Sequence, residues 1–175
     1  IIATNSAPVA NSSAITVDEA SQDTGLGLTA PTDADGDTLT ITVTGLPTLG
    51  QVTKADGTVV NNGDTLTSEE LQGLLYDAPA DYNGTDDPGD FTYNVSDGTE
   101  TVSGSTDITI TTVNDPPTLD LDGDDSSGAT ENDYTTTFTE GGSGVAIGDS
   151  DVVITDVDDT NISATIILTN RPDGD

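Results

Sequence analysis

Residues Ala30–Pro47 read APTDADGDTLTITVTGLP, and this stretch decides the fold that we expect. Its second half alternates threonine with leucine, isoleucine or valine, which is the period of two typical of a strand with one buried face. Its first half places Asp33, Asp35 and Asp37 in a turn directly before that strand. The stretch therefore predicts a β-strand that begins beside concentrated negative charge.

The same alternation recurs along the chain. It is found in segments 39–46 (LTITVTGL), 91–96 (FTYNVS), 107–113 (DITITTV) and 163–170 (SATIILTN). Pairs typical of hairpin turns stand between strand-like segments, at Asp56–Gly57, Asn83–Gly84, Asp97–Gly98 and Asp122–Gly123. We therefore expect an all-β chain. Aromatic side chains set in these patterns are expected in its core, at Tyr76, Tyr82, Phe91 and Tyr93.

One segment departs from the strand pattern. Residues 67–75 (TSEELQGLL) place Thr67 three positions before Glu70, as in a capping box, where each side chain binds the backbone amide of the other residue. The arrangement predicts one short helical turn. Glu69 and Glu70 would then lie in its first turn, where the helix dipole favours negative charge.

The chain has an extreme charge balance. It contains 33 acidic residues and only two basic ones, Lys54 and Arg171, so its formal net charge is -31. Such a chain repels phosphate groups, which disfavours binding to nucleic acids or anionic lipids and favours cations as partners. The sequence has no cysteine and no long apolar run, so we expect neither disulfide bonds nor embedding in a membrane.

The two halves of the chain repeat one pattern. Glu19 precedes a Thr-Asp-x-Asp sequence at Asp33 by an interval similar to that between Glu140 and the Thr-Asp-x-Asp sequence at Asp156. The pair Pro116–Pro117 ends the preceding strand and marks the joint. We expect a linker from a preceding domain at residues 1–6, a sandwich of about seven strands at 7–114, and a second unit at 115–175.

The second unit is short for a sandwich. Residues 115–175 contain only about four strand-like stretches, little more than half of what the fold needs. We expect this unit to be truncated, split by an insertion, or completed by strands of another chain, so that its open edge is a place for association. Both ends of the sequence look cut from a longer polypeptide.

Motifs of both units point to one kind of protein. DADGDTLT, YNGTD, FTYNVSDG and VNDPP follow one another through nearly the whole first unit. In this order they resemble the cadherin-like tandem repeats of large bacterial surface adhesins, including the RTX adhesins. DPPTLDLDG, FTEGG and SATIILTNRPDGD are similar to the first half of another adhesin repeat, which in some members is split by an inserted ligand-binding domain. The resemblance implies an Ig-like or cadherin-like Greek-key β-sandwich on the bacterial cell surface.

The resemblance also implies calcium ions at joints between neighbouring domains of one long polypeptide. Calcium prefers six to eight oxygen ligands, and two carboxylates one residue apart repel each other unless a cation lies between them. The implied ligands of the central joint are Glu19, Asn114, Asp115, Asp156 and Asp158. Those at the amino end are Asn5, Asp33 and Asp35, with Ser6 where the motif has aspartate. Further candidates are Asp37, Asp120 and Asp122, and Asp86 as a substitute for the absent Asp-Arg-Glu tripeptide.

Spacing excludes two other calcium motifs. An EF-hand loop that began at Asp33 would have Thr38 in place of the required glycine and Thr44 in place of the bidentate glutamate. The stretch GGSGVA from Gly141 has Ala146 where the RTX nonapeptide needs aspartate. For any single aspartate, a hairpin turn or a solvated surface remains the alternative to metal binding.

Three classes of function compete. The tandem layout favours a calcium-rigidified extender, which projects the ligand-binding region of an adhesin and so supports cell adhesion or biofilm formation. The alternative is a calcium-dependent ligand-binding module. In such a module calcium coordinates sugar hydroxyls, or a peptide strand pairs with the second unit. An enzyme such as a glycosidase is disfavoured because the sequence has no histidine, cysteine or tryptophan and few aromatic residues.

Overall fold

The computed structural model describes residues 4–137, 139, 141–160 and 163–165 of the 175-residue chain. The chain divides into two compact units, Ile1–Val113 and Asn114–Asp175. The regular elements of the described residues are strands, apart from one helix of five residues. No helix in these ranges is long and apolar enough to cross a membrane. The all-β class expected from the sequence is confirmed.

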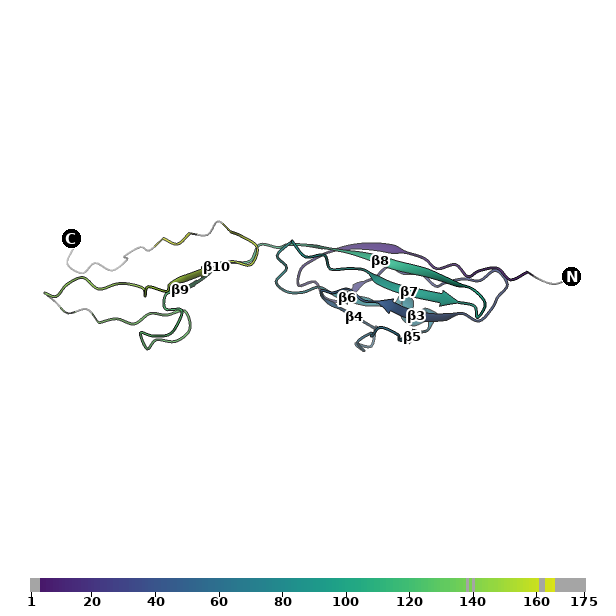
Figure 1. Cartoon of the computed structure of the whole chain (residues 1–175), viewed down its shortest axis with the longest axis horizontal. Helices are drawn as coiled ribbons and strands as arrows, with labels where there is room; N and C mark the ends of the chain where they lie inside the picture. Colours follow the sequence, from purple (N-terminus) through teal and green to yellow (C-terminus); the bar gives the residue numbers. More distant parts are fainter. Residues whose placement is uncertain (1–3, 138, 140, 161–162, 166–175) are drawn as a thin grey trace. The chain divides into compact units, whose positions relative to one another are not determined.

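The larger sheet of the first unit has five strands (Figure 1). In spatial order they are β1 (Ser13–Asp18), β8 (Thr101–Thr111), β7 (Phe91–Ser96), β3 (Thr40–Gly45) and β5 (Thr65–Leu66). β1 runs parallel to β8, with Ser13 opposite Thr106 and Asp18 opposite Thr111. The other neighbours in this sheet are antiparallel.

The smaller sheet has three strands, in the order β2 (Thr24–Gly25), β6 (Leu75–Asp77) and β4 (Gln51–Thr53). The chain passes repeatedly between the two sheets, so that strands distant in sequence, such as β1 and β8, become neighbours, as in a Greek key. The described residues of the first unit thus form eight strands, close to the seven or so expected from its length. Two of these strands, β2 and β5, have only two residues each, too few for alternation to reveal.

Alternation along β3 and β7 builds the core between the sheets. Ile41 and Val43 of β3 are each 1 % exposed, and Phe91, Tyr93 and Val95 of β7 are fully buried. The residues between them are less buried. Burial of each such side chain contributes about 1.5 to 3 kcal/mol. The expected placement of four aromatic residues in the core is confirmed, since Tyr76 is fully buried and Tyr82 is 8 % exposed.

The buried tyrosines also fix loops through their hydroxyl groups. The Tyr93 hydroxyl donates to the carbonyl of Asn11 at 2.6 Å, and the Tyr76 hydroxyl donates to the carbonyl of Leu49 at 2.9 Å. The Tyr93 ring lies directly against Gly104 of β8. A Cβ atom on Gly104 would be 2.5 Å from Tyr93 Cζ and 2.6 Å from the Asn11 carbonyl oxygen. Glycine is therefore required for this close approach.

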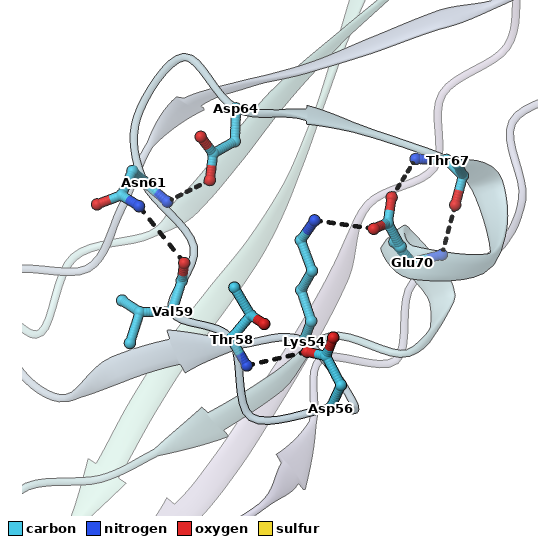
Figure 2. A network of polar contacts seen from close by, with 8 residues as sticks. All are labelled: Lys54, Asp56, Thr58, Val59, Asn61, Asp64, Thr67 and Glu70. Atoms are coloured by element: carbon cyan, nitrogen blue, oxygen red, sulfur yellow. Dashed lines mark hydrogen bonds and ion pairs between the residues drawn. The ribbon is translucent and has the colours of Figure 1, made fainter.

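Helix α1 (Ser68–Gln72) begins with the predicted capping box, which is confirmed (Figure 2). Thr67 Oγ1 accepts from Glu70 N at 3.1 Å, and Thr67 N donates to Glu70 Oε2 at 2.7 Å. Lys54 Nζ lies 2.8 Å from the other oxygen, Glu70 Oε1. The hydrogen bond from Lys54, together with those from Thr67, lowers the pKa of Glu70 to about 2. Lys54 thus forms a salt bridge with Glu70.

The described part of the second unit contains one short antiparallel pair. β9 (Thr118–Asp120) pairs with β10 (Val153–Thr155), so that Thr118 faces Thr155 and Asp120 faces Val153. An apolar hollow of about 360 Å³ is lined by Leu119, Leu121, Ile147, Val152 and Ile154, among others. Of the strand predicted at 163–170, residues 163–165 are not in a strand and the remainder lies outside the described residues.

Candidate metal centre

The turn before β3 brings three predicted ligands together. Asp33, Asp35 and Asp37 each offer one carboxylate oxygen, and these oxygens lie within 4.8 Å of one another. Asp33 Oδ1 accepts from the backbone amides of Asp35 at 2.8 Å and Asp37 at 3.1 Å, which folds the turn around it. Asp33 Oδ2 is buried and accepts no hydrogen bond from any described residue. An acceptor of this kind can bind a cation.

Residues of the amino-terminal segment lie beside this turn. Ser6 N donates to Asp35 Oδ2 at 2.7 Å, and Asn5 Nδ2 donates to Asp97 Oδ2 at 2.9 Å. Asp97 belongs to the turn between β7 and β8, where the sequence predicts only a hairpin residue. Hydrogen bonds from the backbone of Glu100 and from Asn5 lower the pKa of Asp97. Its carboxylate therefore adds negative charge near the predicted site. This proximity depends on how β7 and β8 fold, so the sequence alone does not show it.

Glu19 lies at the other end of β1 and is only 6 % exposed. Its Oε2 accepts from Tyr82 N, and its Oε1 accepts from Val113 N, both at 2.5 Å. Each carboxylate oxygen therefore binds a backbone amide. Among the described residues, Glu19 is not part of a group of three or more converging acidic side chains. This buried carboxylate ties the loop at Tyr82 to the end of β8.

Asp86, another predicted ligand, is exposed in the loop that follows Tyr82. The Tyr82 hydroxyl donates to the Asp86 carbonyl at 2.6 Å, and Asn83 Nδ2 donates to Asp86 Oδ2 at 3.4 Å. The side chain of Asp86 thus takes part in the internal bonding of its own loop. Within the described residues it does not belong to a converging acidic group.

The predicted ligands of the second unit meet at one end of the β9–β10 pair. Asp115 precedes β9, whereas Asp156 and Asp158 follow β10, and the antiparallel register places both segments at the same end. Asp115 N donates to Asp158 Oδ2 at 3.4 Å, and Asp158 N donates to Asp156 Oδ1 at 3.3 Å. Asp158 Oδ1 is buried without a hydrogen-bond donor among the described residues. The exposed Asn114 donates through Nδ2 to the Asp115 carbonyl at 2.8 Å.

The neighbouring carboxyl groups of Asp156 and Asp158 shift each other's pKa in opposite directions. Their mutual hydrogen bond, with partial burial, raises the pKa of Asp158. Burial opposes ionisation of Asp156, but the hydrogen bond from Asp158 and those from the backbone of Asp159 and Asp158 lower the pKa of Asp156 overall. Two neighbouring carboxyl groups repel each other when both are ionised, and a cation bound between them removes that repulsion.

A second group of acidic side chains was not predicted as a site. Asp122, Asp124, Asp149 and Asp151 also converge within 4.8 Å. Only Asp122 had been considered, as a hairpin residue or an additional ligand. The available signal was a pair of Asp-x-Asp sequences, one soon after the segment that forms β9 and one just before the segment that forms β10. Without the register of those strands, nothing in the sequence places the two aspartate pairs together.

The sandwich has a clear counterpart among known families. A family model described as a bacterial Ig domain matches residues 5–111, more than half of the chain. The chain belongs to the bacterial Ig domain family. Comparison with curated proteins gives no match. The match covers the two-sheet sandwich, so Asn5, Glu19 and the Asp33 turn all lie within the bacterial Ig domain.

Membership defines the general role of the first unit. Bacterial Ig domains are structural modules, often found in surface proteins. Such a domain offers its loops as sites carried on a rigid scaffold. Residues 112–175 lie beyond the matched range, so the family assignment applies to the bacterial Ig domain and leaves the second unit to be interpreted from its own residues.

Proposed function

We propose that the chain is a calcium-rigidified extender module of a bacterial surface adhesin of the RTX type. In this proposal it lies outside the cell, between neighbouring domains of one long polypeptide. It projects a ligand-binding region and so supports cell adhesion or biofilm formation. One observation carries the proposal: Asp33 Oδ2 is buried without a hydrogen-bond donor, inside a turn where three carboxylates converge in a bacterial Ig domain.

Electrostatics favours a metal ion over a protein cation at this turn. The single lysine of the sequence, Lys54, is bound to Glu70, so it is not available to the Asp33 turn. The described residues place no basic side chain against these three carboxylates, which therefore repel one another, and a calcium ion would remove that repulsion. Oxygen-only donors are the ligand type that calcium prefers. The ion would hold the turn before β3 in one conformation.

A second calcium ion is proposed for Asp115, Asp156 and Asp158. Its support is the buried oxygen Asp158 Oδ1 and the proximity of the Asp156 carboxyl group, which raises the pKa of Asp158. Following the resemblance to cadherin-like repeats, the second unit is proposed to be part of a split adhesin domain. Asn114, Glu19 and Asp86 remain predicted ligands on the strength of that resemblance alone.

Calcium titration with calorimetry and thermal melting tests the proposal. The wild type is compared with Asp33→Asn/Asp35→Asn and with Asp156→Asn/Asp158→Asn. The control, Asp81→Asn/Asp107→Asn, removes the same charge from exposed residues outside the acidic groups. We expect dissociation constants of about 0.1 to 1 mM and, at tenfold excess over that constant, a gain of about 1.4 kcal/mol per site.

Each ligand variant should lose one binding step, whereas the control should bind as the wild type does. A wild type that neither binds calcium nor melts at a higher temperature in its presence would rule out calcium rigidification. Equal loss of binding in the control would show that the ions are held only by the overall charge of the chain.

A further inference from the structure

The end of the β9–β10 pair opposite Asp115 carries a separate acidic group. Asp122 and Asp124 follow β9, and Asp149 and Asp151 precede β10. Because Asp120 faces Val153 in the antiparallel register, the two loops leave the pair at the same end. One oxygen from each of the four carboxylates lies within 4.8 Å of the others.

Asp122 organises this group from the inside, because its side chain is fully buried. Its Oδ1 accepts from Ser126 N at 3.0 Å, and its Oδ2 accepts from Ser127 N at 2.8 Å. Ser126 Oγ donates to Asp149 Oδ2 at 2.8 Å, and Asp149 N donates to the Leu121 carbonyl at 2.8 Å. The loops after β9 and before β10 are therefore joined to each other through charged groups.

A separate observation points to a missing ligand. Asp151 Oδ1 is buried, yet it accepts no hydrogen bond from the described part of the chain. It belongs to one of the four converging carboxylates, beside the fully buried Asp122. A buried carboxylate oxygen without a donor carries a large desolvation cost unless a cation compensates it. The described residues of the second unit include neither lysine nor arginine to do so.

The geometry points to one calcium ion bound by Asp122, Asp124, Asp149 and Asp151, which holds the folded loops of the second unit. Four carboxylates in irregular loops provide the flexible oxygen shell that calcium accepts, whereas magnesium demands near-ideal octahedral geometry and keeps its waters. The three-residue strands of β9 and β10 are too short to be stable as an isolated pair. The ion supplies the missing cross-link between their loops. This site is independent of the adhesin function and of the ions at Asp33 and Asp158.

The inference predicts a difference between the two units. The first unit has its own buried core, which we expect to keep it folded without an ion. The second unit should lose its structure when calcium is removed. Amide hydrogen exchange on the full chain reads both units at once, in EDTA, in calcium at about 5 mM, and in magnesium at the same concentration.

The informative amides are those of Ser126 and Ser127, which donate to Asp122. In the wild type we expect calcium to slow their exchange at least about tenfold, and in Asp33→Asn/Asp35→Asn the strands of the first unit should exchange alike with and without the ion. Asp151→Asn should abolish the slowing, and Asp33→Asn/Asp35→Asn should retain it. The matched control in the same unit is Asp133→Asn, at an exposed position outside the group, and it should respond as the wild type does.

Three results would overturn the inference. The first is exchange at Ser126 and Ser127 in wild-type protein that is equally slow in EDTA and in calcium. The second is an Asp151→Asn variant that responds to calcium as fully as the wild type. The third is equal protection by magnesium, which would make the site a general divalent one. Loss of the response in Asp151→Asn alone, with Asp33→Asn/Asp35→Asn unaffected, supports this site even if the Asp33 ion proves absent.

Discussion

Glu19→Gln is the substitution that most sharply separates a structural carboxylate from a calcium ligand. Glu19 was predicted as a ligand, but both of its oxygens accept backbone amides, from Tyr82 and from Val113. Glutamine has nearly the same shape and keeps one carbonyl oxygen. Its amide group, however, presents a donor to one of the two backbone N–H groups, so one hydrogen bond is lost.

The cost follows from the burial of this contact. A hydrogen bond to a charged group contributes about 1.5 to 3 kcal/mol, and a buried donor left without an acceptor adds to the loss. With Glu19 only 6 % exposed, we expect Glu19→Gln to lower the free energy of unfolding by about 2 to 4 kcal/mol. For a unit of this size that lowers the melting temperature by roughly 10 to 20 °C.

The assay is thermal unfolding of the full chain, followed by the near-ultraviolet circular dichroism of the buried tyrosines, in EDTA and in calcium. Glu100→Gln, at an exposed position, is the matched control and should melt within about 0.5 kcal/mol of the wild type. If Glu19→Gln has the same melting temperature as the wild type in EDTA and a lower one only in calcium, Glu19 is a calcium ligand. The structural role argued for its carboxylate would then be wrong.

Three further predictions concern the first unit. Gly104→Ala should lower the free energy of unfolding by about 1 to 3 kcal/mol, because its Cβ would be 2.5 Å from Tyr93 Cζ; denaturant unfolding measures this, and unchanged stability would contradict the packing. Thr67→Ala should cost about 1 kcal/mol in the same assay through loss of the helix cap, whereas no change would mean that the cap contributes nothing. The pKa of Glu70 is lowered from 4.5 to about 2, so its contact with Lys54 stabilises the fold fully above pH 4.5 and is lost as the pH falls toward 2. Stability measured against pH for wild type and Lys54→Met should therefore converge in that window, and a constant difference would refute the assignment.

The sandwich was predictable because its strands are strongly alternating and its turns have characteristic residues. FTYNVS at residues 91–96 became β7, with its three apolar residues buried, and the capping box at Thr67 formed as expected. The strands β2 and β5 were not predictable, because two-residue ladders depend on the partner strand rather than on local pattern. The sequence also could not show that β1 would pair in parallel with β8, which requires contacts between distant segments.

The candidate sites were predictable only where the ligands are close in sequence. Asp33, Asp35 and Asp37 converge in one turn, and their spacing alone suggested this. Asp122 follows β9 and Asp151 precedes β10, so their proximity depends on strand register. The sequence showed that Glu19 is a carboxylate placed directly after a strand. It could not show that the two donors to this carboxylate are backbone amides, because any loop amide can donate to it.

The parallel pairing of β1 with β8 determines how the first unit would carry a pulling force. Because the two strands run in the same direction, the chain enters β1 at one end of the sandwich and leaves β8 at the opposite end. Tension on the chain ends therefore pulls the two strands past each other along their length. The ladder from Ser13 and Thr106 to Asp18 and Thr111 is then loaded in shear, with its hydrogen bonds strained together rather than opened one at a time. A domain built in this way stays folded under stretching that would unzip a terminal hairpin.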